Sequence, residues 1–155
     1  MSSQAYPMNQ FAPDYFQGMN VPDPSQTGQE IKPYSYIYNP PNGQLTMDQQ
    51  IEGDTVAIQT DADFYMFAWY ISLFTGAFQI RLTDSTGYRL QDGFLNSGAI
   101  SQSSNEPTVF SPMHFFPAGS KILIDIEDLS DATNPLQIVF PGIKVYRINR
   151  TTSGK

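Results

Sequence analysis

Apolar and polar residues alternate with a period of two along much of the chain, as they do in half-buried β-strands. The clearest example spans residues 121–127, where isoleucines share one parity and mostly charged residues take the other: Ile122, Ile124 and Ile126 against Lys121, Asp125 and Glu127. Turn-forming residues precede this segment at 117–120 and follow it at 131–134. We therefore predict a strand with one buried face.

Two more apolar strands are predicted directly afterwards, at 136–140 and 143–148, separated by a turn at Pro141-Gly142. Three strands joined by tight turns form a meander. The apolar face of a meander needs a second sheet to cover it. This part of the chain therefore predicts a β-sandwich.

Earlier segments show the same pattern. Three tyrosines alternate in one predicted strand, and Pro33 favours an edge position for it: Tyr34, Tyr36 and Tyr38. A second clear strand carries Phe78, Ile80 and Leu82 on one parity, and Tyr88 with Leu90 begins a return strand. Turns are predicted at 40–43, 53–54, 84–87 and 92–93, where proline, glycine, asparagine or aspartate cluster.

The most apolar run, Phe64 to Phe74, lacks clean alternation. It predicts a central strand that is covered on both faces, with a short helix as the competing interpretation. Together the segments predict an all-β protein, a jelly-roll-like β-sandwich of about nine or ten strands. We place the sandwich domain at residues 31–150 and a flexible tail at 151–155.

Residues 1–30 are predicted to form an extended arm, because prolines interrupt them and Ser, Gln and Asn fill the intervals. The arm also contains four aromatic residues, which a fully solvated tail does not need: Tyr6, Phe11, Tyr15 and Phe16. One interpretation is that these rings dock onto the body or onto a neighbouring subunit. The other is a loosely ordered terminus whose aromatics have no role.

Composition excludes several classes of function. The 155 residues contain no cysteine, so neither a disulfide framework nor thiolate chemistry is possible, which suits a reducing cytoplasm. A net charge of −7 with eight dispersed basic residues argues against nucleic-acid binding. No apolar run is long enough to cross a bilayer, and the N-terminus does not resemble a signal peptide.

Catalytic motifs are weak. His114 is the only histidine, so any Ser-His-Asp triad must include it, and a structural histidine is the favoured interpretation. The sequence Asp84-Ser85-Thr86-Gly87 is spaced differently from the aspartic-protease signature and has no second copy, so it predicts a turn. We identify no catalytic residues and expect no cofactor, so an enzyme is disfavoured.

Two binding interpretations stay open. Acidic residues cluster near one turn and could in principle hold calcium, although their strand parity and the absence of a glycine-centred loop argue against it: Asp125, Glu127, Asp128 and Asp131, with Asn134 nearby. Trp69 could serve as a platform for a sugar ring in a carbohydrate-binding module, but it lies in the most apolar run. Sequence alone identifies no metal ligands.

One longer pattern resembles a known class of proteins. The segments are Phe116-Pro117-Ala118-Gly119-Ser120, Ile122–Ile126, Asp128-Leu129, Asn134, Gln137–Gly142 and Lys144-Val145-Tyr146. This pattern resembles the small β-sandwich or jelly-roll proteins that decorate or cement the heads of tailed bacteriophages. The resemblance covers about the C-terminal half of the chain.

The resemblance implies a non-enzymatic structural protein of the virion, made in the host cytoplasm. Its expected partners are copies of itself, commonly as a homotrimer, and the major capsid protein or another virion protein. The arm residues Tyr6, Phe11, Tyr15 and Phe16 would anchor these contacts, so we expect deletion of residues 1–30 to weaken assembly and leave a folded body. A neck, tail or fibre-attachment subunit is the main alternative, and a carbohydrate-binding module the second.

Overall fold

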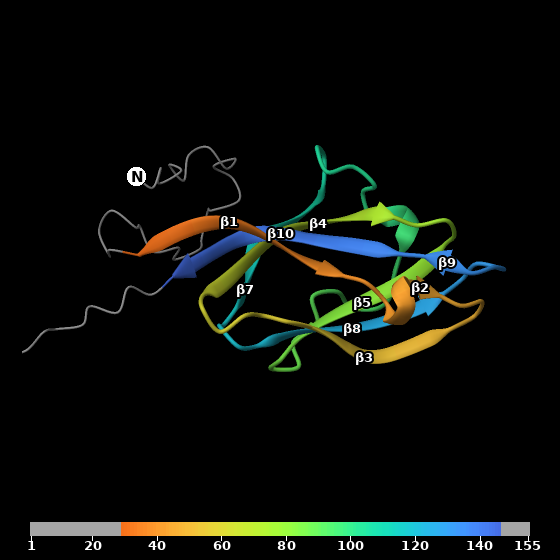
Figure 1. Ribbon diagram of the computed structural model, residues 1–155, viewed down its shortest axis with the longest axis horizontal. Coiled ribbons are helices and arrows are strands. Elements are labelled where there is room, and N and C mark those ends of the chain that lie inside the picture. Colours follow the sequence, from red (N-terminus) through yellow and green to blue (C-terminus); the bar gives the residue numbers. More distant parts are fainter. Residues whose placement is uncertain (1–28, 147–155) are drawn as a thin grey trace, which may run out of the picture.

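A computed structural model describes residues 29–146 and shows two four-stranded antiparallel sheets facing each other (Figure 1). Sheet I has the strand order β1 (Glu30–Tyr38), β10 (Gln137–Tyr146), β4 (Asp63–Leu73), β7 (Thr108–Phe116). Sheet II has the order β3 (Gln50–Ala57), β8 (Lys121–Asp128), β5 (Phe78–Asp84), β6 (Leu95–Asn96). The short strands β2 (Gln44–Leu45) and β9 (Asn134–Pro135) pair at one end. The predicted all-β sandwich of about ten strands is confirmed.

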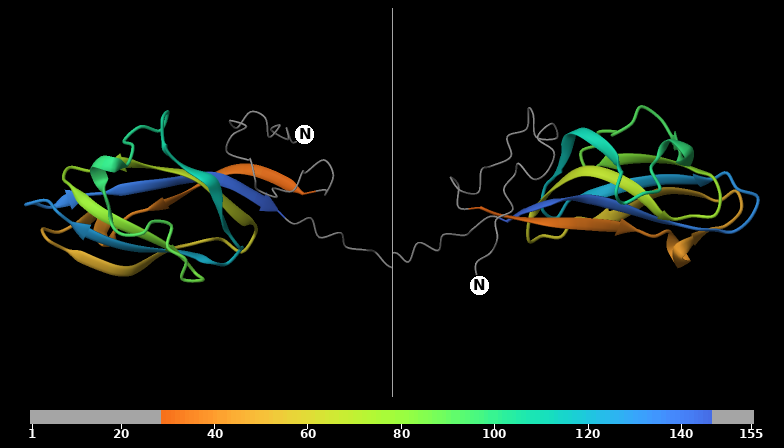
Figure 2. Two further views of the ribbon diagram at one scale, coloured as in Figure 1. Left: turned by 180° about the vertical axis from the view of Figure 1, so that it is seen from behind. Right: turned by 90° about the horizontal axis from the view of Figure 1, so that it is seen from above.

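Helical structure in the described part is limited to two short 3₁₀ turns, η3 (Pro41–Gly43) and η4 (Ser97–Ala99). In residues 29–146 no helix has the length and apolar character needed to span a membrane. The predicted turn at 40–43 is confirmed, and Asn42 and Gly43 both take positive φ there. The opposite view and the view from above in Figure 2 show the same two layers.

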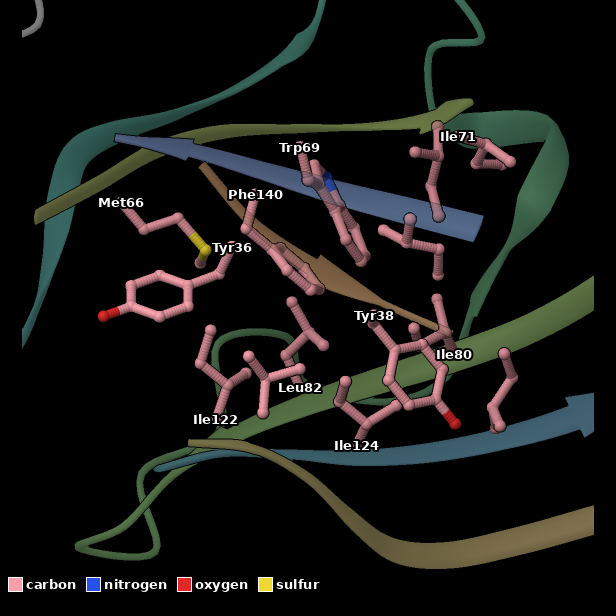
Figure 3. Packing of buried hydrophobic residues seen from close by; sticks show 14 of the residues in the cluster. Tyr36, Tyr38, Met66, Trp69, Ile71, Ile80, Leu82, Ile122, Ile124 and Phe140 are labelled. Atoms are coloured by element: carbon pink, nitrogen blue, oxygen red, sulfur yellow. The ribbon is translucent and has the colours of Figure 1, made fainter. Parts of the chain in front are cut away.

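The hydrophobic core lies between the two sheets (Figure 3). From sheet I, Trp69 and Phe140 stack with ring centroids 6.4 Å apart and point toward sheet II. Sheet II contributes apolar side chains from the alternating positions that the sequence predicts to be buried: Phe78, Ile80, Leu82, Ile122, Ile124 and Ile126. Shape-matched burial of these residues accounts for the pairing of the sheets.

The apolar run at 64–74 is not a helix: all of it but Phe74 belongs to strand β4, in the middle of sheet I between β10 and β7. Its broken alternation has a local cause. Register shifts lie between Met66 and Ala68 against β7 and near the same point against β10. An extra residue in the strand reverses the parity there, so Phe64 and Met66 face the core before it and Trp69 and Ile71 after it.

The predicted meander over residues 121–148 is wrong in its connections. Strand β8 belongs to sheet II and β10 belongs to sheet I, so the segment between them crosses from one sheet to the other. A short connection between successive apolar strands is compatible with either a hairpin or such a crossing. The alternating pattern predicts which residues are buried, but it does not tell which sheet they join.

The predicted turn at Pro141-Gly142 is also wrong, because β10 continues through both residues. Pro141 lies opposite Ser35 on β1, and the β10–β4 register shifts between Val139 and Gly142. A β-ladder tolerates a residue without an N–H at such an irregularity. Gly142 allows close contact between strands, since a Cβ there would lie 2.2 Å from the carbonyl oxygen of Tyr65.

Two further local predictions need correction. Gly53-Asp54 lies inside β3, where Gly53 has φ +68° and the register against β8 shifts between Ile51 and Asp54, so it forms a bulge and not a turn. The return strand expected at residues 88–90 is reduced to one isolated bridge, between Thr83 and Arg89. The edge position predicted for the tyrosine-rich strand is confirmed, because β1 ends sheet I.

Candidate interaction face

The outer face of sheet I, which points away from the core, is apolar. Strand pairing brings together residues of the parity opposite to the core residues, from all four strands of the sheet: Ile31 and Ile37 of β1, Val139, Ile143 and Val145 of β10, Tyr65, Phe67 and Tyr70 of β4, and Val109, Met113 and Phe115 of β7. An antiparallel sandwich usually places polar residues on such a face. This face is therefore the strongest candidate for an interaction surface in the described residues.

Part of the outer face forms a second hydrophobic cluster, separate from the main core. Ile143, Val145 and Met113 are only 0%, 2% and 3% exposed, and Ile31, Tyr65 and Phe67 pack against them. Val145 lies opposite Ile31 in the β1–β10 ladder. Burial this complete on an outward-facing sheet surface is typical of residues beneath a contact layer.

Around this cluster, apolar side chains remain accessible. Ile37 is 50% exposed, Phe115 40% and Val109 37%. The ring of Phe115 also packs against Tyr65, with centroids 5.1 Å apart. Rigid rings and branched side chains of this kind supply most of the binding energy at protein interfaces.

The outer face of sheet II has the opposite chemistry. The outward residues of β5 and β8 pair as Arg81 with Asp125, at 2.7 Å between Nη2 and Oδ2, and Gln79 with Glu127. Gln50 of β3 donates a second hydrogen bond to Glu127. These cross-strand polar pairs suit a solvated surface. The two faces of the sandwich therefore differ in character, and only sheet I presents an extended apolar layer.

Burial raises the pKa of the Asp125 carboxyl, but hydrogen bonds from Arg81 and from the Gly53 N–H outweigh it, so the pKa lies below its usual value of 3.8. The carboxyl of Asp84 behaves similarly. Burial raises its pKa, but hydrogen bonds from the Thr86 hydroxyl and from the backbone N–H groups of Thr86 and Tyr88 have the larger effect, so the net pKa is lowered. Both groups thus favour the folded state when ionised.

We expect acid to destabilise the fold through these two carboxylates. Because their folded pKa values are lowered, their contribution is present above the unfolded value of 3.8 and is lost as the pH falls through the folded values. Urea unfolding at pH 6 and pH 3 measures the decline. The double variant Asp84→Asn/Asp125→Asn should be less stable at pH 6 and decline less toward pH 3. An unchanged decline would contradict this assignment.

A buried lysine closes one end of the sandwich beneath β1. Lys144 is 1% exposed, and its ammonium donates hydrogen bonds to Gln59 and to the Asp61 carboxylate, at 3.1 and 3.2 Å for the latter. It also lies 3.9 Å from the ring centroid of Tyr34. Burial lowers the pKa of this lysine, but Asp61 and Tyr36 raise it more, so the net direction is upward. The positive charge of Lys144 is thus compensated by Asp61 and stabilised by Gln59 and Tyr34, which argues for a structural role of this lysine.

An open groove runs between the edge strands β1 and β3. Two tyrosine hydroxyls bridge it: Tyr36 accepts from the Gln59 N–H at 2.9 Å, and Tyr38 donates to Asp54 at 3.0 Å. Burial and the neighbouring Asp54 carboxylate raise the pKa of Tyr38 far above its usual value, so the hydroxyl stays a donor. These bridges hold the two sheets together at this edge.

The histidine considered as a triad member lies on β7 beside the 84–87 turn. His114 Nε2 is 3.0 Å from Asp84 Oδ2, and its ring stacks on Tyr88 and meets Phe116 edge-on. In the described residues, Asp84 is its one hydrogen-bonded side chain, and no hydroxyl nucleophile is bonded to it. The predicted turn at 84–87 is confirmed, with Gly87 at φ +90° and its N–H bonded to the Asp84 carbonyl.

The acidic residues considered for calcium do not converge. Asp125 binds Arg81, and Glu127 binds two glutamines. Asp128 is buried and accepts from Ser130, from Asn134 and from the Asp48 N–H. Across residues 29–146 no three histidine or carboxylate side chains come together as a metal site requires. These carboxylates fix local structure.

The remaining sequence candidates divide in two. Trp69 is 1% exposed inside the core, so it cannot offer a platform to a sugar ring. The four arm residues proposed as interaction anchors, Tyr6, Phe11, Tyr15 and Phe16, lie outside the described residues.

The outer face of sheet I was not identified from sequence as a site. The available signal was that residues 138–143 contain no polar side chain on either parity, which is typical of a strand covered on both faces.

Comparison with known proteins gives no assignment. No protein-family model matches the chain, and no curated protein matches it by sequence. Any statement of function therefore depends on the chemistry of the surface and on the resemblance described above.

Proposed function

We propose that this protein is a non-enzymatic structural component of a virion, a capsid decoration or cement protein of a tailed bacteriophage. The observation that carries the proposal is the apolar outer face of sheet I, because exposed apolar patches of this kind mark association surfaces. The resemblance of the C-terminal half to such proteins supplies the particular role. Its partners would be copies of itself, as a homotrimer, and the major capsid protein.

In this proposal the protein acts by binding as a rigid body and carries out no chemical reaction. A sandwich with a dense core keeps the outer face of sheet I in one shape, so little conformational entropy is lost when it binds. Self-association multiplies the contacts that each assembly makes with a shell. Linked contacts raise the overall affinity far above that of a single copy. The polar outer face of sheet II would stay toward solvent.

We predict that polar substitutions on the apolar face weaken association. Each exposed side chain of the face should contribute about 1 kcal/mol when buried, so the triple variant Ile37→Ser/Val109→Ser/Phe115→Ser should bind roughly a hundredfold more weakly. The matched control replaces three apolar residues of similar or greater exposure that lie outside sheet I: Met47→Ser/Phe94→Ser/Leu129→Ser. Co-sedimentation with phage heads that lack the protein measures both. Equal binding by the two triple variants would exclude the face.

A neck, tail or fibre-attachment subunit would use the same face on a different partner. Electron microscopy of the phage particle separates the two roles by the position of the chain. Density for this sandwich on the head shell would support a cement protein. Density at the neck, tail or fibre base would replace that role with the alternative.

A further inference from the structure

The described chain begins at the border of the apolar face. Strand β1 starts at Glu30, opposite Tyr146, and the next pair is Ile31 with Val145, both on the outer face of sheet I. The segment of residues 1–28 therefore joins the body beside the buried cluster of Met113, Ile143 and Val145. These outward-facing side chains are at most 3% exposed, which indicates that a layer lies over them.

We infer that residues 1–28 lie across the outer face of sheet I of the same copy, as an extended strap. The strap covers the buried cluster of Met113, Ile143 and Val145 in the free protein, and the accessible side chains of Ile37, Val109 and Phe115 stay available for association. This inference goes beyond the proposed function, because it concerns the isolated chain and holds whatever the chain assembles with.

The segment is long enough for this role. Twenty-eight residues in an extended conformation span up to about 90 Å. Four strands about 4.8 Å apart make a sheet only about 15 Å wide between its outer strands. The segment can therefore cross the face and return, starting from the end of β1.

The chemistry of the segment also fits the face. It supplies apolar area from four rings and from two internal methionines besides Met1: Tyr6, Phe11, Tyr15, Phe16, Met8 and Met19. Residues 1–28 contain no lysine or arginine, and their only charged side chains are Asp14 and Asp23, so few charges would have to stay in water at the edge of the face. Prolines at 7, 13, 22 and 24 disfavour a helix and favour an extended chain.

Because residues 1–28 are covalently joined to β1, they should bind sheet I of their own chain in preference to sheet I of a neighbouring copy. A tethered segment experiences an effective concentration of the face in the millimolar range. A neighbouring copy at micromolar concentration competes poorly with that. In a dilute solution the strap should therefore close on its own body.

The absence of cysteine allows a direct test by paramagnetic broadening. The full chain carries one new cysteine, Gln17→Cys, with a nitroxide label beside Tyr15 and Phe16. We expect severalfold broadening of amide signals from sheet I, including Ile143, and little from the outer face of sheet II, including Lys121. Substituting Tyr15→Ser/Phe16→Ser in the labelled chain should remove the broadening.

A mixed sample identifies which copy the strap covers. It contains ¹⁵N-labelled chains without nitroxide and unlabelled chains with nitroxide, so broadening there reports contact between copies. We expect none at micromolar concentration. Broadening of sheet I only in the mixed sample, or equal broadening of both sheets, would overturn the inference. Neither outcome bears on shell binding, so failure of the strap and failure of the assembly role are distinguishable.

Discussion

Replacing Gly142 with alanine is expected to lower the free energy of unfolding by about 3 kcal/mol, because the new methyl group has no space. A Cβ at this position would lie 2.2 Å from the carbonyl oxygen of Tyr65 and 2.5 Å from Cε2 of Phe64. Both neighbours belong to β4 in the middle of sheet I, so neither moves without disturbing the ladder. Urea unfolding, followed by the fluorescence of buried Trp69, measures the loss.

The matched control is Gly93→Ala. An added Cβ at Gly93 has no atom within 4 Å. We expect this substitution to change the free energy of unfolding by less than about 0.5 kcal/mol. Equal stability of the two alanine variants would show that β4 and β10 are not as close at Gly142 as the structure has them.

Replacing Asn134 with alanine is expected to cost about 3 kcal/mol, because the side chain satisfies several buried polar groups at once. Asn134 is 0% exposed. Its Oδ1 accepts from the N–H groups of Thr75 and Gly76, and its Nδ2 donates to the Gly76 carbonyl and to Asp128. Alanine leaves those groups buried without this partner. Thermal unfolding should shift down by about 10 °C.

Asn39→Ala is the corresponding control. Asn39 is exposed, and its Oδ1 accepts one hydrogen bond, from Gln137. Loss of a single exposed hydrogen bond should change stability by less than about 0.5 kcal/mol. If Asn134→Ala unfolds at the same temperature as Asn39→Ala, the network around Asn134 does not hold the end of the sandwich.

The sequence predicts local structure well where burial alone decides it. The alternation of Ile122, Ile124 and Ile126 indicates the buried face of β8, and the structure confirms it. It does not predict long-range pairing, because the same pattern is compatible with either sheet. Pro141-Gly142 shows the limit most clearly. A turn is the usual context of that pair, and only the crowding by β4 explains the glycine inside a strand.

The interaction face shows a second limit of prediction from sequence. Exposed apolar residues such as Ile37, Val109 and Phe115 lie far apart in the sequence and meet only through the strand order of sheet I. No short motif marks them. The apolar residues on both parities of β10 were the one local indication of a covered outer surface. The arm residues Tyr6, Phe11, Tyr15 and Phe16 could be proposed from composition, and their role stays a prediction.

Sedimentation equilibrium of the full chain over a concentration series tests the association surface most directly. The proposal predicts a mass near three times the 17.4 kDa of one chain as concentration rises, and a mass near 17.4 kDa for Ile37→Ser/Val109→Ser/Phe115→Ser at the same concentrations. An unaltered chain that stays at 17.4 kDa throughout the series would contradict the account.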